Sequence, residues 1–195
     1  MPVDNYAIQV ERARALFLTY DQPAMCARLG LPMTPDAIPI RFLGEMHLVR
    51  RSDGMVLGPD GGPASFGAVM AIYDALARTN TPRLAGTFVP TSALHGIHGT
   101  HAVHESLHSP AAQRFAGKTA ALEQALLSLG GRPWDGPGDV AYTLDVFDFF
   151  PVCLRFWDAD EEFPASLQFL WDANALDYLY YETLWYVMDA LLDRL

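Results

Sequence analysis

A chain of 195 residues is long enough to bury one substantial hydrophobic core, and no break in composition divides it, so we expect one globular domain over residues 1–195. The sequence is 51% hydrophobic and 18% charged, which excludes a disordered chain, and charged residues interrupt every apolar stretch well before the roughly 20 residues of a membrane span. The formal net charge of −10 repels phosphates and so argues against nucleic acid and anionic membranes as partners.

The first half of the chain predicts three helices and a small antiparallel sheet. The expected elements are helices over 5–20, 22–29 and 66–78 and strands over 38–42, 46–49 and 55–57. The apolar face of the first helix comprises Tyr6, Val10, Ala13, Leu16 and Phe17. The Asp53-Gly54 pair is typical of a hairpin turn, and Ser65 is the expected cap of the third helix.

The second half predicts a block of strands between helices. Pro110 suits the first turn of a helix capped by Ser109, and that helix is expected to end at about Leu129, before two glycines. The further elements are strands over 87–89, 140–147, 152–157 and 165–171, a loop over 132–139 and a helix over 182–195. Because strands and helices segregate into blocks, we expect an α+β fold with a largely antiparallel sheet packed with helices.

The amino terminus and the cysteines predict a reducing compartment. The first residues show no basic cluster followed by an apolar run, as a secretory signal has, so a cytoplasmic location is expected. The two cysteines, Cys26 and Cys153, are too few for a disulfide framework or a four-cysteine iron–sulfur cluster. Cys153 falls in a predicted strand and is expected to be buried, and no spacing supports a Cys–His nucleophile pair.

Histidine is concentrated in one short segment. Five of the 6 histidines lie between residues 95 and 108, where an even distribution places fewer than one. They are His95, His98, His101, His104 and His108. Neutral imidazole is the commonest side-chain ligand for borderline transition metals. The segment therefore predicts a site for zinc, iron or copper, or an axial ligand for haem, although it specifies no reaction.

The spacing of these histidines selects the expected ligands. Glycines precede residue 100 and a proline follows residue 109, so a short helix over 101–108 is expected. On that helix His101, His104 and His108 lie within an arc of about 60° and can converge on one ion. His98, in the glycine-flanked part of the segment, is the fourth ligand in reserve.

Other interpretations of the same segment stay open. Glu105 is the candidate general base or an additional ligand, which makes a metal-dependent hydrolase one alternative. Residues 104–108 also match the H-E-x-x-H string of metalloproteases, but Ser109-Pro110 interrupts the helix that this string needs. The remaining alternative is a metal-free polar loop in an interaction domain, whose acidic surface and aromatic cluster meet a protein partner.

An acidic run over 158–162 looks at first like a calcium loop. An EF-hand that begins at Asp158 needs Gly and Glu at its sixth and twelfth positions, but Phe163 and Phe169 stand there. We expect a solvated hairpin turn instead.

Several short motifs stand in the last third of the chain: Gly138-Asp139, Pro151-Val152, Trp157, Asp160-Glu161-Glu162-Phe163-Pro164, Asp172, Asn174-Ala175 and Tyr178-Leu179. Phe42-Leu43-Gly44 and Asp60-Gly61 add a less specific match near the front. In these residues the chain resembles a bacterial and archaeal family known as domain of unknown function 3786. The resemblance implies a single globular domain and no established activity. Some relatives carry an appended cysteine-rich iron–sulfur module, which this chain lacks, and the resemblance does not account for the histidine segment.

Overall fold

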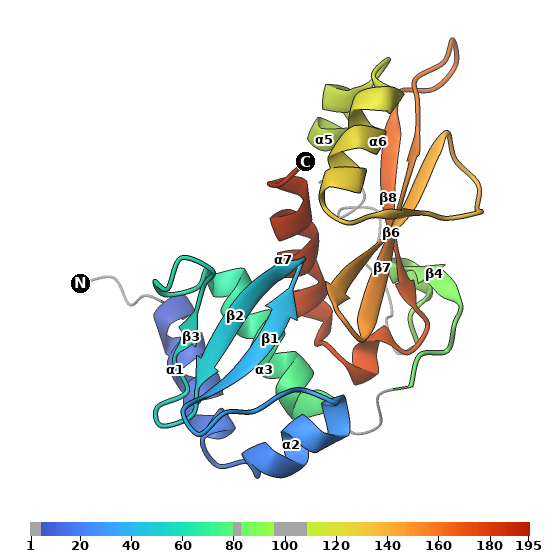
Figure 1. The fold of residues 1–195 in the computed structure, drawn as a ribbon. Helices are drawn as coiled ribbons and strands as arrows, with labels where there is room; N and C mark the ends of the chain where they lie inside the picture. The colour runs from blue at the N-terminus through green and yellow to red at the C-terminus, as the bar shows by residue number, and fades with distance from the viewer. Residues whose placement is uncertain (1–4, 80–82, 96–108) are drawn as a thin grey trace.

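The computed structural model describes residues 5–79, 83–95 and 109–195 and contains two antiparallel sheets with helices packed against them (Figure 1). The small sheet has the strand order β1-β2-β3, and the large sheet has the order β4-β8-β7-β6-β5. This arrangement confirms the expected α+β class and its antiparallel pairing. No helix within the described ranges is long and apolar enough to cross a membrane.

The small sheet forms where apolar and polar residues alternate along the chain. Strand β1 (Ala37–Phe42) pairs with β2 (Glu45–Arg50), which in turn pairs with β3 (Val56–Leu57). Ile38 and Ile40 are fully buried on the inner face of β1, and the residues between them are less covered. The period-2 pattern thus places one face of this sheet on the hydrophobic core.

Three helices lie with the small sheet: α1 (Asn5–Phe17), α2 (Gln22–Leu29) and α3 (Phe66–Arg78). The Asp21 side chain accepts a hydrogen bond from the Ala24 amide at the start of α2, and Gly30 ends that helix in the left-handed conformation. The Ser65 hydroxyl caps α3 by accepting from the Ala68 amide, as predicted. Helix α3 is buried along most of its length and contacts both α1 and α2.

The large sheet forms the centre of the second half of the core. Its strands are β4 (Phe88–Pro90), β5 (Arg132–Pro133), β6 (Val140–Phe147), β7 (Phe150–Trp157) and β8 (Ser166–Asp172). Val152, Cys153 and Leu154 in β7 are all fully buried, so both faces of this strand are covered. Helix α5 (Ser109–Phe115) contacts β8, and α6 (Thr119–Ser128) contacts β6.

The two sheets meet where β1 contacts β6, and the end of the last helix is bonded to the turn that follows β1. Figure 1 shows α7 (Tyr181–Leu192) beside α3, where its buried residues are Thr183, Leu184, Val187, Met188 and Leu191. After β1, the Leu43 amide donates to the Val146 carbonyl of β6 at 2.9 Å. Arg194, just after α7, donates from Nη1 to the Leu43 carbonyl at 2.7 Å. One continuous set of contacts therefore connects both halves.

Two sequence expectations were wrong in detail. The helix expected from Pro110 to Leu129 is broken into α5 and α6, because Gly117 adopts φ of 68° and its amide donates to Asp158 Oδ1 at 2.7 Å. The apolar face of α1 is mostly uncovered: Leu16 remains 53% exposed, and Phe17 alone is buried. That exposed side of α1 is one wall of the site described next.

Candidate functional site

A cleft of about 610 Å³ lies between α1 and α3, beside the segment that leads into α7. Its lining combines aromatic and aliphatic side chains with two carboxylates and one guanidinium: Ala13, Leu16, Phe17, Tyr20, Met70, Tyr73, Asp74, Ala77, Arg78, Asp177 and Tyr180. These residues come from α1 and the turn after it, from α3, from the end of the 3₁₀ turn η3 (Ala175–Asp177) and from Tyr180, which precedes α7. A concave, mainly apolar surface with few polar groups is typical of small-molecule sites.

Arg78 is held in place by its own contacts at one end of the cleft. Its guanidinium lies 3.8 Å from the centre of the Tyr180 ring, and its Nη2 donates to the Leu176 carbonyl at 2.8 Å. Its Nε is buried with no hydrogen-bond partner among the described residues. The cation is thus stacked and hydrogen-bonded within the protein, which reduces its availability to a ligand.

Of the two described carboxylates that line the cleft, Asp177 is exposed and Asp74 is buried, with 6% of its surface exposed. Its Oδ2 accepts from the Tyr180 amide at 3.1 Å and from the Thr183 hydroxyl, so a side chain of α3 supplies the cap that α7 lacks locally. Within the described part of the chain Oδ1 accepts no hydrogen bond, and it is not one of the polar atoms buried without a partner, so it is open to the cleft. Burial raises the pKa of Asp74, and the bonds from Thr183 and Tyr180 partly offset that rise.

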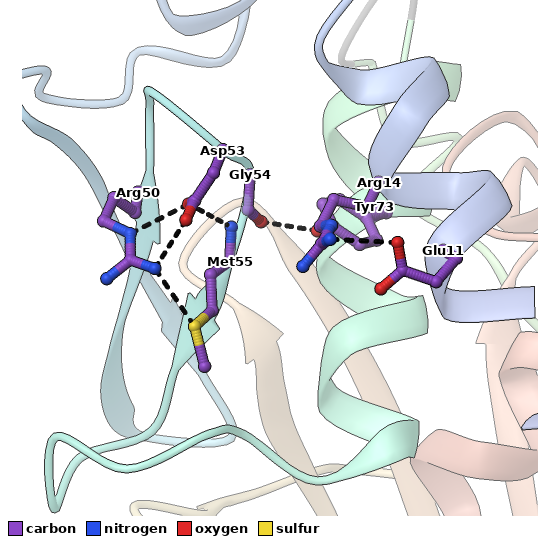
Figure 2. Close-up of polar contacts among 7 residues, drawn as sticks. All are labelled: Glu11, Arg14, Arg50, Asp53, Gly54, Met55 and Tyr73. Atoms are coloured by element: carbon purple, nitrogen blue, oxygen red, sulfur yellow. Dashed lines mark hydrogen bonds and ion pairs between the residues drawn. The ribbon is translucent and has the colours of Figure 1, made fainter. Parts of the chain in front are cut away.

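Tyr73 anchors the wall of the cleft to the small sheet. Its hydroxyl donates to the Gly54 carbonyl, and burial raises the pKa of Tyr73 to about 12, so the phenol stays protonated at neutral pH. Figure 2 shows this contact beside the turn after β2. A Cβ added to Gly54 would lie only 2.9 Å from Arg14 Cγ, so the turn packs directly against α1.

The turn that carries Gly54 is itself braced by a charge pair. Arg50 Nε donates to Asp53 Oδ1 at 2.8 Å, and the same oxygen accepts from the Met55 amide at 3.0 Å (Figure 2). The hydrogen bond from Arg50 is the main cause that lowers the pKa of Asp53 to about 2, so this carboxylate is ionised at neutral pH. The position of Tyr73 is therefore fixed from the small sheet as well as from α3.

Apart from His95, the histidine segment lies outside the described residues. This applies to the predicted ligands His98, His101, His104 and His108 and to the candidate base Glu105. Where the chain is described, no group of three or more His, Cys, Asp or Glu side chains is arranged to hold a metal ion. The flanking residues are placed: Leu94 is buried, and both η1 (Thr91–Ala93) and α5 contact β8.

The two cysteines and His47, the histidine outside the segment, all lie in described parts of the structure. Cys26 and Cys153 are both buried free thiols, and burial raises the pKa of Cys153 to about 12, which opposes a nucleophilic thiolate. His47 is buried, and its Nδ1 lies 3.1 Å from the Glu45 carbonyl in the same strand. Cys153 is thus buried as expected.

Sequence reasoning missed the cleft because its residues belong to two helices read as ordinary amphipathic segments. One signal was present: Asp74 is the single acidic residue in the mainly apolar helix 66–78, which ends with Arg78. A charged residue at a core-facing helical position needs a partner, and its partners here come from residues 180 and 183. That long-range pairing is not visible in local periodicity.

Three of the aspartates in the motifs that carry the family resemblance accept hydrogen bonds from backbone amides. Asp139 accepts from the Asp158 amide at 2.7 Å, and Asp160 accepts from the amides of Glu162 and Phe163 within its own turn. The acidic run is thus a hairpin turn between β7 and β8, as expected. Among the motif residues named, Asp172 is the most buried carboxylate, with three backbone amide donors.

Comparison with known proteins gives a family but no function. No curated protein and no solved structure matches the chain. The family model described as domain of unknown function (DUF3786) matches residues 21–194. The α3 and α7 sides of the cleft fall within this match, whereas the α1 side precedes it. Because the match covers most of the sequence, the chain belongs to the DUF3786 family.

Proposed function

We propose that this protein is a binding domain whose ligand, a small organic molecule, occupies the cleft between α1 and α3. The observation that carries the proposal is Asp74: a buried carboxylate with one unbonded oxygen, set in the wall of a cleft. A carboxylate oxygen that is open to a concave surface is available to a hydrogen-bond donor of a ligand. The cleft volume of about 610 Å³ suits a molecule of drug-like size or smaller.

The polar groups of the cleft support binding rather than a reaction. Arg78 is engaged with Leu176 and Tyr180, and Asp74 holds the start of α7. Tyr73 is tied to the Gly54 carbonyl and keeps its proton. A catalytic group needs freedom to exchange a proton or to attack. Arg78 and Tyr73 are committed to structural contacts, and Asp74 is held through Oδ2, so only its Oδ1 is open to a ligand.

A blocking substitution tests the proposal. Ala77 is half-buried in the cleft wall, so Ala77→Leu places three extra carbons in the space. We expect it to weaken binding of small aromatic fragments, detected by saturation-transfer NMR, by at least about tenfold, which corresponds to about 1.4 kcal/mol. Ala121→Leu, at an exposed position of α6, is the matched control and should bind like the unmodified protein. Equal binding by both variants places the ligand elsewhere and contradicts the proposal.

The second candidate function is binding of a transition metal, or of haem, through His98, His101, His104 and His108. The concentration of histidines in residues 95–108 favours it, and the described elements on either side of that range, η1 and α5, both contact β8. A metal-dependent hydrolase with Glu105 as base is the catalytic form of this proposal. The metal-free alternative is an interaction domain that meets a protein partner.

Elemental analysis separates these alternatives. We expect tag-free protein, purified without chelator, to contain close to one equivalent of zinc, iron or copper, or to show a haem absorption band. His101→Ala combined with His104→Ala should remove most of the metal, and Glu105→Gln should leave it in place. Substitution of His47 with alanine is the control for a histidine outside the segment. Metal-free protein that takes up no ion on titration returns the segment to a polar loop.

A further inference from the structure

The chemistry of the cleft defines the class of ligand, given the proposed function. We propose that the cleft binds an organic cation, a primary ammonium attached to an apolar or aromatic body, with Asp74 Oδ1 as the acceptor for the ammonium group.

The polar atom that the cleft leaves open to a ligand is Asp74 Oδ1, a hydrogen-bond acceptor. A carboxylate oxygen accepts hydrogen bonds and donates none when ionised, so the ligand group that meets Asp74 Oδ1 must be a donor. Asp74 is more than nine-tenths buried, and its Oδ2 already serves the Tyr180 amide and the Thr183 hydroxyl. Oδ1 accepts no such bond from the described residues and is not one of the polar atoms buried without a partner, so it is open to a donor from a ligand.

The charged side chains that line the cleft favour a cationic ligand. Two carboxylates, Asp74 and Asp177, line the cleft with one cation, Arg78. Arg78 is bonded to the Leu176 carbonyl and stacked on Tyr180, whereas the Asp177 side chain is exposed at the rim. The protein also carries a net charge of −10, which attracts cations and repels anions. A charge-assisted bond from an ammonium compensates a buried carboxylate better than a neutral hydroxyl does.

The rest of the cleft lining is largely apolar and favours a ligand with an apolar body. Leu16, Phe17 and Met70 present aliphatic and aromatic surface, and Tyr20 lies half-buried beside them. Leu16 is 53% exposed, although it lines a concave surface. A ligand body that covers this surface removes apolar area from water. The arrangement therefore fits a molecule with one ammonium end and one apolar end.

Three probes of nearly equal shape test the assignment on the full chain: 2-phenylethylammonium, the neutral 2-phenylethanol and the anionic 3-phenylpropanoate. Affinities are measured by NMR titration at neutral pH and low salt. We expect the ammonium to bind at least about tenfold more tightly than the alcohol, and the anion to bind most weakly. Asp74→Asn keeps an acceptor for α7 but loses the charge, so it should abolish the preference for the ammonium and retain affinity for the alcohol.

The outcomes distinguish this inference from the proposed function. If the alcohol binds as tightly as the ammonium, or the anion binds best, and Ala77→Leu still weakens binding, the cleft is a ligand site but the cation assignment is wrong. If no probe binds, or Ala77→Leu has no effect, both fail. The comparison of the three probes on the unmodified protein needs no variant, so it stands even if Asp74→Asn does not fold.

Discussion

Replacing Asp172 with alanine should lower the free energy of unfolding by about 3–5 kcal/mol, the largest loss we expect from one polar side chain in this protein. Asp172 is 2% exposed, and it accepts from the Ala85 and Asn174 amides through Oδ1 and from the Gly86 amide through Oδ2, at 2.8–2.9 Å. Removal of the carboxylate leaves three amide donors unpaired where the segment before β4 meets the end of β8.

Urea unfolding of Asp172→Ala beside Asp160→Ala measures this loss. Asp160 also accepts from two backbone amides, but it is exposed and its donors belong to its own turn. Water can replace those bonds, so the control should lose less than about 1 kcal/mol. Equal losses in the two variants would show that burial and long-range pairing do not set the strength of the Asp172 contacts.

The second large effect is expected at Asp74. Asp74→Ala removes the acceptor for the Tyr180 amide and the Thr183 hydroxyl, and α7 has no local side-chain cap to replace it. We expect a loss of about 2–3 kcal/mol in the free energy of unfolding, measured by urea titration. Asp74→Asn retains an acceptor oxygen and should lose much less. A loss in Asp74→Asn as large as in Asp74→Ala would contradict the capping role.

Asp74 also predicts a pH dependence with a definite sign. Burial raises its pKa in the folded protein above the ordinary value of 3.8, so between these two values the folded state holds a proton that the unfolded chain has released. The contribution of Asp74 to stability therefore falls as the pH rises through its folded pKa. Arg78 opposes the rise and Glu182 adds to it. The difference in the free energy of unfolding between the unmodified protein and Asp74→Asn, measured against pH, gives the pH-dependent contribution of Asp74.

Much of the fold could be predicted because local patterns and tertiary contacts agree. The alternation in Ile38 and Ile40, the Asp53-Gly54 turn and the Ser65 cap each specify an element that the structure contains. The break at Gly117 could not be predicted, because its amide is satisfied by Asp158, 41 residues away. Local propensity favours a continuous helix there, and a distant contact decides otherwise.

The candidate site was less predictable than the fold. The exposed side of α1 looks like a core-facing stripe in the sequence, and the structure leaves it as the wall of a cleft. Asp74 becomes informative only once its partners in α7 are known. The histidine segment is the reverse case: its composition is the strongest signal in the sequence, and its role stays a prediction.

The central claim, that the cleft between α1 and α3 is a ligand site, is tested most directly by methyl NMR of the full chain. On addition of 2-phenylethylammonium, the signals of Ala13, Met70 and Ala77 should shift together and saturate at one affinity, whereas that of the exposed Ala121 should not move. Shifts confined to methyl groups outside the cleft, or no saturable shift at these three, would contradict the account.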